Sequence, residues 1–220
     1  MSAMQQIVGS ARLTAKLVFQ SVSYANALNI NLPSGVSVGD LLVFFDGPSN
    51  TSSTPPAAPS PSGWTLVGTN TAVDAYDASS QRSTIFYKVA TAGDISTGSV
   101  AGSTGNSTAR KTMSCFRPSS FINTLTALGF QGVGATGSLS PQTIVSGNSP
   151  ATCLALVYGR ANGVTHITGA GMTLLTDPST VIQEGAYAIQ NTSTNNFTVS
   201  AASSASYVRA TLQSFYLLLT

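Results

Sequence analysis

GDLLVFF, at residues 39–45, is the stretch that decides the fold. Gly39 and Asp40 are turn formers, and the five apolar residues after them include the β-branched and aromatic types that strands favour. An apolar run of this length that starts at a turn predicts a buried strand. Similar short runs, bounded by Gly, Pro, Asn and Ser, recur along the chain, and helical periodicity is nearly absent. The sequence therefore predicts an all-β protein.

Many short strands joined by loops favour a jelly-roll-like β-sandwich. The expected strands are residues 17–22, 41–45, 65–67, 83–89, 112–116, 127–130, 152–158, 172–175, 186–190, 197–200 and 209–219. The only helical candidate is the weak one at 5–16, which can equally be an extended arm. The proline-rich stretch 49–62 reads as a loop.

A series of four strand motifs occurs twice in the same order. The first half contains GDLLVFF, SGWTLV, IFYKVA and ARKTMSCF, and the second contains ATCLALVY, AGMTLL, GAYAIQ and VRATLQSF. We therefore predict two related units packed in tandem: an amino-terminal arm at 1–16, a first β-sandwich unit at 17–137 and a second β-unit at 138–220, with the boundary near 138–149. Chance similarity among strands is the alternative.

Charged residues make up 7% of the 220 residues, against roughly 25% in an ordinary soluble domain. The polar surface must then consist of hydroxyl and amide groups, which suits a chain packed against neighbours. The net charge is +2 and only Arg110 and Lys111 are adjacent basic residues, so the sequence predicts no nucleic-acid binding. The 42% hydrophobic content argues against disorder.

Two cysteines, Cys115 and Cys153, each lie in an apolar run, where a thiol behaves as a small buried hydrophobe. We expect buried free thiols, with a disulfide between them as the open alternative. Residues 1–9 show no secretory signal, and no run of about 18 apolar residues is present. The sequence therefore predicts no membrane span and synthesis in the cytoplasm.

Few residues are available for catalysis or metal binding. His166 is the only histidine and has no partner at zinc-ligand spacing. Asp74 and Asp77 form only a weak calcium signal. Asp46 with Glu184 is a possible glycosidase pair that spacing does not support. We predict a protein that is not an enzyme and has no catalytic, cofactor-binding or metal-binding residues. Four acids next to turn residues are expected to cap backbone amides: Asp40, Asp46, Asp94 and Asp177.

Trp64 is the only tryptophan, and its neighbours suggest that it packs on the core. The functional alternative is that its ring stacks on a sugar. Three tyrosines are further candidates for such stacking: Tyr24, Tyr76 and Tyr207.

LPSGVSVGDLLV at residues 32–43, PSGWT at 61–65 and FYKVA at 86–90 together resemble a pattern of phage and prophage β-rich structural proteins, and GMT at 171–173 resembles a later element of it. The resemblance covers about residues 32–176. It implies a structural protein on the exterior of a phage particle and brings no catalytic residue.

From the resemblance, the low charge and the missing chemistry, we expect a capsid decoration or cement protein. Its partners would be the major capsid protein or other virion proteins, and it would form a homo-oligomer, a trimer. The arm at 1–16 would take part in assembly. The alternative is a tail fibre or receptor-binding adhesin module that recognises a host glycan.

Overall fold

The computed structural model describes most of the chain. It covers residues 16–73, 79–103, 108–122, 124–137, 142–146, 152–161, 167–170, 172–176, 183–190, 197–203 and 207–219. These residues form antiparallel sheets and one short helix, so the all-β prediction is confirmed. The helical or extended arm expected before residue 16 lies outside the described residues.

Two five-stranded sheets form the body of the molecule. The first sheet has the order β1 (Leu17–Asn26), β7 (Thr108–Pro118), β3 (Leu41–Asn50), β5 (Ser80–Val89) and β4 (Thr65–Val73). The second sheet has the order β8 (Leu125–Gly137), β15 (Tyr207–Leu219), β10 (Thr152–Ala161), β13 (Gln183–Gln190) and β12 (Thr173–Thr176).

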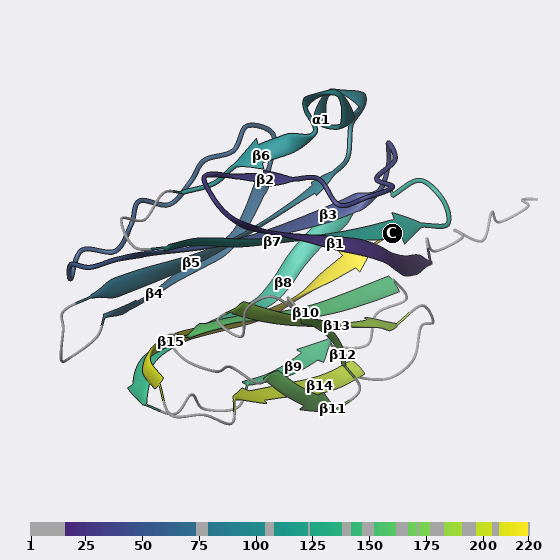
Figure 1. The fold of residues 1–220 in the computed structure, drawn as a ribbon. Coiled ribbons are helices and arrows are strands. Elements are labelled where there is room, and N and C mark those ends of the chain that lie inside the picture. The colour runs from purple at the N-terminus through teal and green to yellow at the C-terminus, as the bar shows by residue number, and fades with distance from the viewer. Residues whose placement is uncertain are drawn as a thin grey trace, which may run out of the picture.

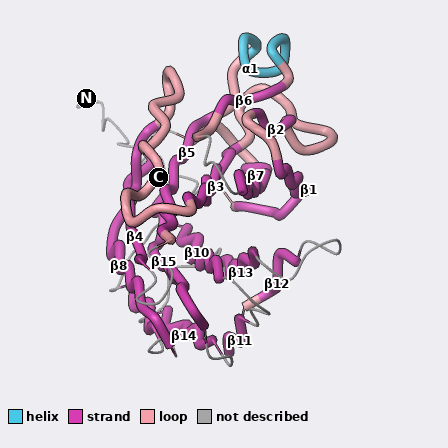
Figure 2. Tube along the Cα trace, turned by 60° about the vertical axis from the view of Figure 1, so that its left-hand side comes forward, coloured by secondary structure: helices cyan, strands magenta, loops and turns pink. Residues whose placement is uncertain are grey.

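Smaller sheets lie on the outside of both. One is formed by β2 (Asn29–Asn31) and β6 (Ser99–Ala101), next to helix α1 (Ala92–Thr97), and the other by β11 (Ile167–Ala170), β14 (Phe197–Ser203) and β9 (Gln142–Ser146). Figures 1 and 2 show the resulting stack, with the two large sheets in the middle and a small sheet beyond each of them. The inner faces of the large sheets are therefore buried against each other.

Alternate residues of the central strands fill the core between the large sheets, as strand geometry requires. Leu41, Val43 and Phe45 point inward from β3, and Leu154, Leu156 and Tyr158 point inward from β10. The rings of Phe45 and Tyr158 stack at 5.1 Å with an angle of 10°. The Tyr158 hydroxyl lies 2.9 Å from that of Ser114 on β7, so the buried phenol has a polar partner.

A second core covers the outer face of the first sheet. Leu42 and Phe44 of β3 pack there with Met113 and Cys115 of β7, under Ile30 of β2 and Val100 of β6. Both faces of β3 are thus buried, which explains why GDLLVFF is a continuous apolar run rather than an alternating one.

The two large sheets also agree in register. Tyr87 of β5 pairs with Thr65 and Val43, and Val43 pairs with Ser114. Correspondingly, Tyr187 of β13 pairs with Thr173 and Leu156, and Leu156 pairs with Phe215. By this register the residue of the first sheet that is equivalent to Phe215 is Ser114. The motif spacing suggests Phe116 instead, two residues away.

All eleven expected strands coincide with strands of the structure. The sequence analysis missed helix α1 and four short strands of the small sheets, namely β2, β6, β9 and β11. It did indicate β14, the longest strand of those sheets. β8, which falls at the end of the first expected unit, pairs with β15 in the second sheet.

Candidate functional site

The outer face of β3 and β7 has an ion pair at each end and apolar residues between them. Along β3 this face carries Asp40, Leu42, Phe44 and Asp46; along β7, in the opposite direction, it carries Arg117, Cys115, Met113 and Lys111. A pocket adjoins each end of this strip. The two ends are therefore the candidate site regions.

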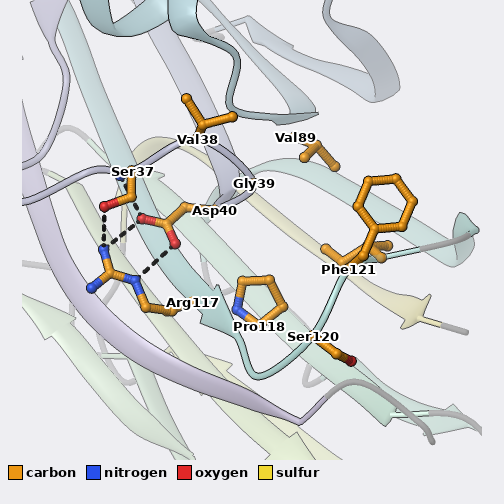
Figure 3. Close-up of a pocket in the computed structure, with 10 residues that line it drawn as sticks. Ser37, Val38, Gly39, Asp40, Val89, Arg117, Pro118, Ser120 and Phe121 are labelled. Carbon is orange, nitrogen blue, oxygen red and sulfur yellow. Dashed lines mark hydrogen bonds and ion pairs between the residues drawn. The ribbon is translucent and has the colours of Figure 1, made fainter.

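Asp40 and Arg117 form the ion pair at the first end (Figure 3). Arg117 donates from Nη2 to Asp40 Oδ2 at 2.8 Å and from Nε to Oδ1 at 3.0 Å, which is a two-pronged contact. The Asp40 side chain is 3% exposed and that of Arg117 is 42% exposed. Burial alone raises the pKa of Asp40, but the hydrogen bonds and charge of Arg117 and the Ser37 amide outweigh it, so the pKa lies below its usual value.

The same pair fixes the turn at residues 35–40. The Ser37 amide donates to Asp40 Oδ2 at 2.8 Å, and Arg117 Nη2 donates to the Gly35 carbonyl at 2.7 Å and to Ser37 Oγ at 3.1 Å. Gly35 and Gly39 have φ of 75° and 93°, which other residues rarely adopt. The expectation that Asp40 caps turn amides is thus confirmed.

Cys115 lies next to this pair, with Sγ 3.5 Å from Asp40 Oδ2. Burial and the neighbouring carboxylate raise the pKa of the thiol to about 12. A thiol that stays protonated is a poor nucleophile, so Cys115 has a packing role. Cys115 and Cys153 are both free and buried, as the sequence predicted.

A pocket of about 450 Å³ adjoins the first ion pair, between the turn at 37–40 and the segment after β7. Figure 3 shows Asp40 and Arg117 on one side of Pro118 and the Phe121 ring on the other. Val38 is 64% exposed and Phe121 is 85% exposed, so two large apolar side chains meet solvent here. We call the surface formed by Val38, Phe121 and the partly exposed Arg117 the apolar ledge.

The chain enters β1 beside this ledge. The Lys16 amide donates to Ser119 Oγ at 3.0 Å, and the Ser119 amide donates to the Lys16 carbonyl at 2.7 Å. Lys16 is the first described residue, so the segment before it joins the fold beside Ser119, two positions before Phe121.

Asp46 and Lys111 form the ion pair at the second end, and both side chains are fully buried. Lys111 Nζ lies 3.2 Å from Asp46 Oδ1 and donates to the Ser103 carbonyl at 2.9 Å. The Ser103 amide donates to Asp46 Oδ2 at 3.1 Å, and Ser103 Oγ donates to the Ala57 carbonyl at 2.6 Å. Burial raises the pKa of Asp46, against the opposing effects of Lys111 and Ser103. The pair anchors two loops to the sheet.

A pocket of about 510 Å³ lies at this end, between the proline-rich loop at 59–62, helix α1 and strand β6. Trp64 lines it and packs edge-on against Phe44, with ring centroids 5.9 Å apart. Asp94 lines it from α1, where it completes a capping box with Thr91. Trp64 thus packs on the core and also lines a pocket. Its sequence neighbours could not show that it has both roles.

The expected turn formers fall into three groups. Asp40 and Asp94 cap backbone amides as predicted. Asp46 accepts from a backbone amide, that of Ser103, but its prediction as a turn former was wrong: it lies within β3 and pairs with Lys111, because Gly47 and Pro48 continue the strand instead of turning. Asp177 lies outside the described residues.

Several other candidates also lie outside the described part of the chain. These are His166, the Asp74 and Asp77 pair, Tyr76, and the side chains of Glu184 and Tyr207. Tyr24 lies in β1. Within the described residues, no group of three His, Cys, Asp or Glu side chains comes together, and no helix is long and apolar enough to cross a membrane.

Comparison of the chain with family models, with curated proteins and with solved structures gave no match.

Proposed function

We propose that the chain is a non-enzymatic structural protein on the exterior of a phage particle, and that it acts as a capsid decoration or cement protein. The observation that carries this proposal is the apolar ledge, where Val38 and Phe121 are exposed beside the point at which the amino-terminal segment joins the fold. Exposed apolar residues that lie together, rather than singly, mark contact surfaces, and Val38 and Phe121 line the same pocket. The low charge of the chain favours the same role.

The occupant of the ledge is the amino-terminal segment of a neighbouring copy. This segment carries Met1, Met4, Ile7, Val8 and Leu13, which are apolar residues without strand alternation. It joins each copy next to the copy's own ledge, so a ring of copies can pass each segment to the next ledge. The exchange would make a trimer whose outer rim is free to bind the major capsid protein.

The architecture that fits this role is a pair of tandem jelly-roll-like units. The equal strand orders and the equal register around Tyr87 and Tyr187 support a duplication. We place the division between Pro118 and Leu125, because β8 occupies the position in the second sheet that β1 occupies in the first. Both units then begin with the edge strand of their large sheet.

Deletion of residues 1–9 tests the arm, and Phe121→Ser tests its receptor. Each change should leave the melting temperature nearly unchanged, because the deleted residues precede β1 and Phe121 is exposed. Each should lower the trimer fraction in analytical ultracentrifugation and the occupancy on purified particles. Ser120→Ala is the matched control beside Phe121. A trimer that persists in both variants overturns the arm exchange.

The place of the protein in the particle is tested separately. Antibody labelling and quantitative mass spectrometry of purified particles should find copies over the whole head, in fixed proportion to the shell protein. Labelling confined to the tail, at a few copies per particle, would overturn the decoration role and favour the second candidate.

That second candidate is a receptor-binding module that recognises a host glycan. The observation in its favour is that Trp64 lines an open pocket together with hydroxyl-bearing side chains.

A further inference from the structure

We infer that the pocket between the proline-rich loop, α1 and β6 binds a neutral saccharide, with Trp64 as the stacking platform. The occupant sits against Trp64, under the hydroxyl groups of Ser62, Thr97 and Ser99, and within reach of the Asp94 carboxylate. The inference deepens the second candidate function and rests on it for its biological role. The binding itself does not depend on where the protein lies in a particle.

Trp64 is held in a way that leaves part of its ring to the pocket. Its contact with Phe44 is edge-on, at an interplanar angle of 68°, and the residue is only partly buried. Packing against this cluster therefore fixes the ring without burying the residue completely. Aromatic rings pack well against the apolar faces of sugar rings, because these present C–H groups to the π-system.

The rest of the lining supplies hydrogen-bonding groups rather than a second apolar wall. Hydroxyl-bearing residues line the pocket from the proline-rich loop, from α1 and from β6, and the Thr97 hydroxyl, which donates to the Gly93 carbonyl at 2.9 Å, can still accept a hydrogen bond. Asp94 accepts from Lys88 Nζ at 2.7 Å through Oδ1 and from the Thr91 amide at 2.8 Å through Oδ2. These contacts fix the carboxylate, and Oδ1 retains a lone pair for a sugar hydroxyl.

Charge decides the class of ligand. Burial alone raises the pKa of Asp94, but its hydrogen bonds with Lys88 and Thr91 and the Lys88 charge lower it, so the group is ionised. Among the described residues, Asp94 is the only ionisable side chain that lines the pocket, and the Lys88 ammonium is paired with it. Because this ion pair is neutral overall, the pocket offers a phosphate or an acidic sugar no net positive charge to pair with. A neutral polyhydroxyl compound needs only hydrogen-bond donors and acceptors, which the lining residues supply.

The walls are held rigid from below. Gly102 lines the pocket directly above the buried ion pair, and a Cβ on it would overlap Lys111 Cε and Asp46 Oδ1. Ser103 ties the same segment to Ala57 of the proline-rich loop. The ion pair therefore sets the position of two walls of the pocket, and fixed walls reduce the ordering cost of binding.

Trp64 also provides the test, because it is the only tryptophan in the chain and its emission reports on this pocket alone. The probes are soluble oligosaccharides of glucose, galactose, mannose and N-acetylglucosamine, titrated into the intact protein. At least one series should change the emission saturably. Inorganic phosphate should not.

Variants connect the signal to the pocket. Ala101→Phe, at an exposed lining position, should fill the pocket and weaken the affinity at least tenfold while leaving the circular dichroism spectrum unchanged. Trp64→Phe should keep the packing on Phe44 and weaken binding by a smaller factor, measured by calorimetry. Leu174→Ala, an exposed change in the second large sheet, is the control and should bind like the wild type.

Two results overturn the inference. One is an emission that no oligosaccharide changes although acrylamide quenches it, which would show an accessible ring without a ligand. The other is an Ala101→Phe variant with unchanged affinity, which would place the sugar elsewhere. Saccharide binding without adsorption to host cells would reject the receptor function alone and leave the site in place.

Discussion

The first and second large sheets have matching strand order and register, but their outer faces differ in charge. In the first sheet Asp40 pairs with Arg117 and Asp46 with Lys111. By register, the corresponding positions in the second sheet hold Cys153 opposite Leu218 and Gly159 opposite Leu212. Both ion pairs are therefore features of the first sheet only.

The inner faces, in contrast, are alike. Leu41, Val43 and Phe45 correspond by register to Leu154, Leu156 and Tyr158, and all six are buried in the shared core. Phe45 and Tyr158 are corresponding residues that stack on each other. Contact between equivalent residues is the mark of a two-fold interface. The inner faces are therefore constrained by each other, whereas the outer faces differ.

The largest effect should come from breaking the shared inner face. Phe45→Ala and Tyr158→Ala should each lower the free energy of unfolding by about 3 to 5 kcal/mol, the usual cost of truncating a buried aromatic residue. Because the two rings stack, the double variant should cost less than the sum of the single ones. Urea denaturation followed by circular dichroism measures all three values.

The same experiment tests whether the two sheets fold as one unit. A shared core predicts a single transition that moves as a whole in each variant. Two transitions, of which Phe45→Ala shifts only one, would show that the sheets are stable separately and that the inner faces contribute little to each other.

The next effect concerns the buried ion pair that the second sheet does without. Lys111→Met should cost about 3 kcal/mol, because it leaves the Asp46 carboxylate buried without its partner. Asp46→Leu combined with Lys111→Met should recover most of this loss, since an apolar pair resembles the second sheet at these positions. Chemical denaturation of the two variants checks both values.

Saccharide titration of the same double variant sharpens the comparison. If the ion pair positions the pocket walls through Ser103, the double variant should be stable yet bind less tightly. A double variant as unstable as Lys111→Met would show that the ion pair is needed for the first sheet itself.

The sequence was sufficient for the strands with strong apolar runs, because burial on both faces makes such runs conspicuous, as at Leu41 to Phe45. It did not indicate β2 and β6, which are three residues long and carry one buried apolar residue each, Ile30 and Val100. Helix α1 had a visible signal in Thr91 and Asp94, but six residues show no helical periodicity. The Asp40–Arg117 and Asp46–Lys111 ion pairs were not predictable, because they join residues more than 60 positions apart and depend on strand register.

The smallest effect concerns the ion pair at the apolar ledge, and pH measures it. The pKa of Asp40 is lowered in the fold, so the stabilisation is present above the unfolded value of about 3.9 and is lost as pH falls through the lower folded value. Arg117→Met removes the main group that lowers this pKa and leaves burial, which raises it. The variant should lose only a small part of its free energy of unfolding at neutral pH, because Arg117 is 42% exposed and solvent screens its charge. Its unfolding free energy should also fall less steeply than that of the wild type between about pH 4 and pH 2. Lys16→Met, which removes one positive charge from an exposed residue, is the control and should keep the wild-type slope. An Arg117→Met variant with the wild-type slope would mean that the Ser37 amide alone lowers the pKa of Asp40, and that the ion pair serves only to fix the turn beside the ledge.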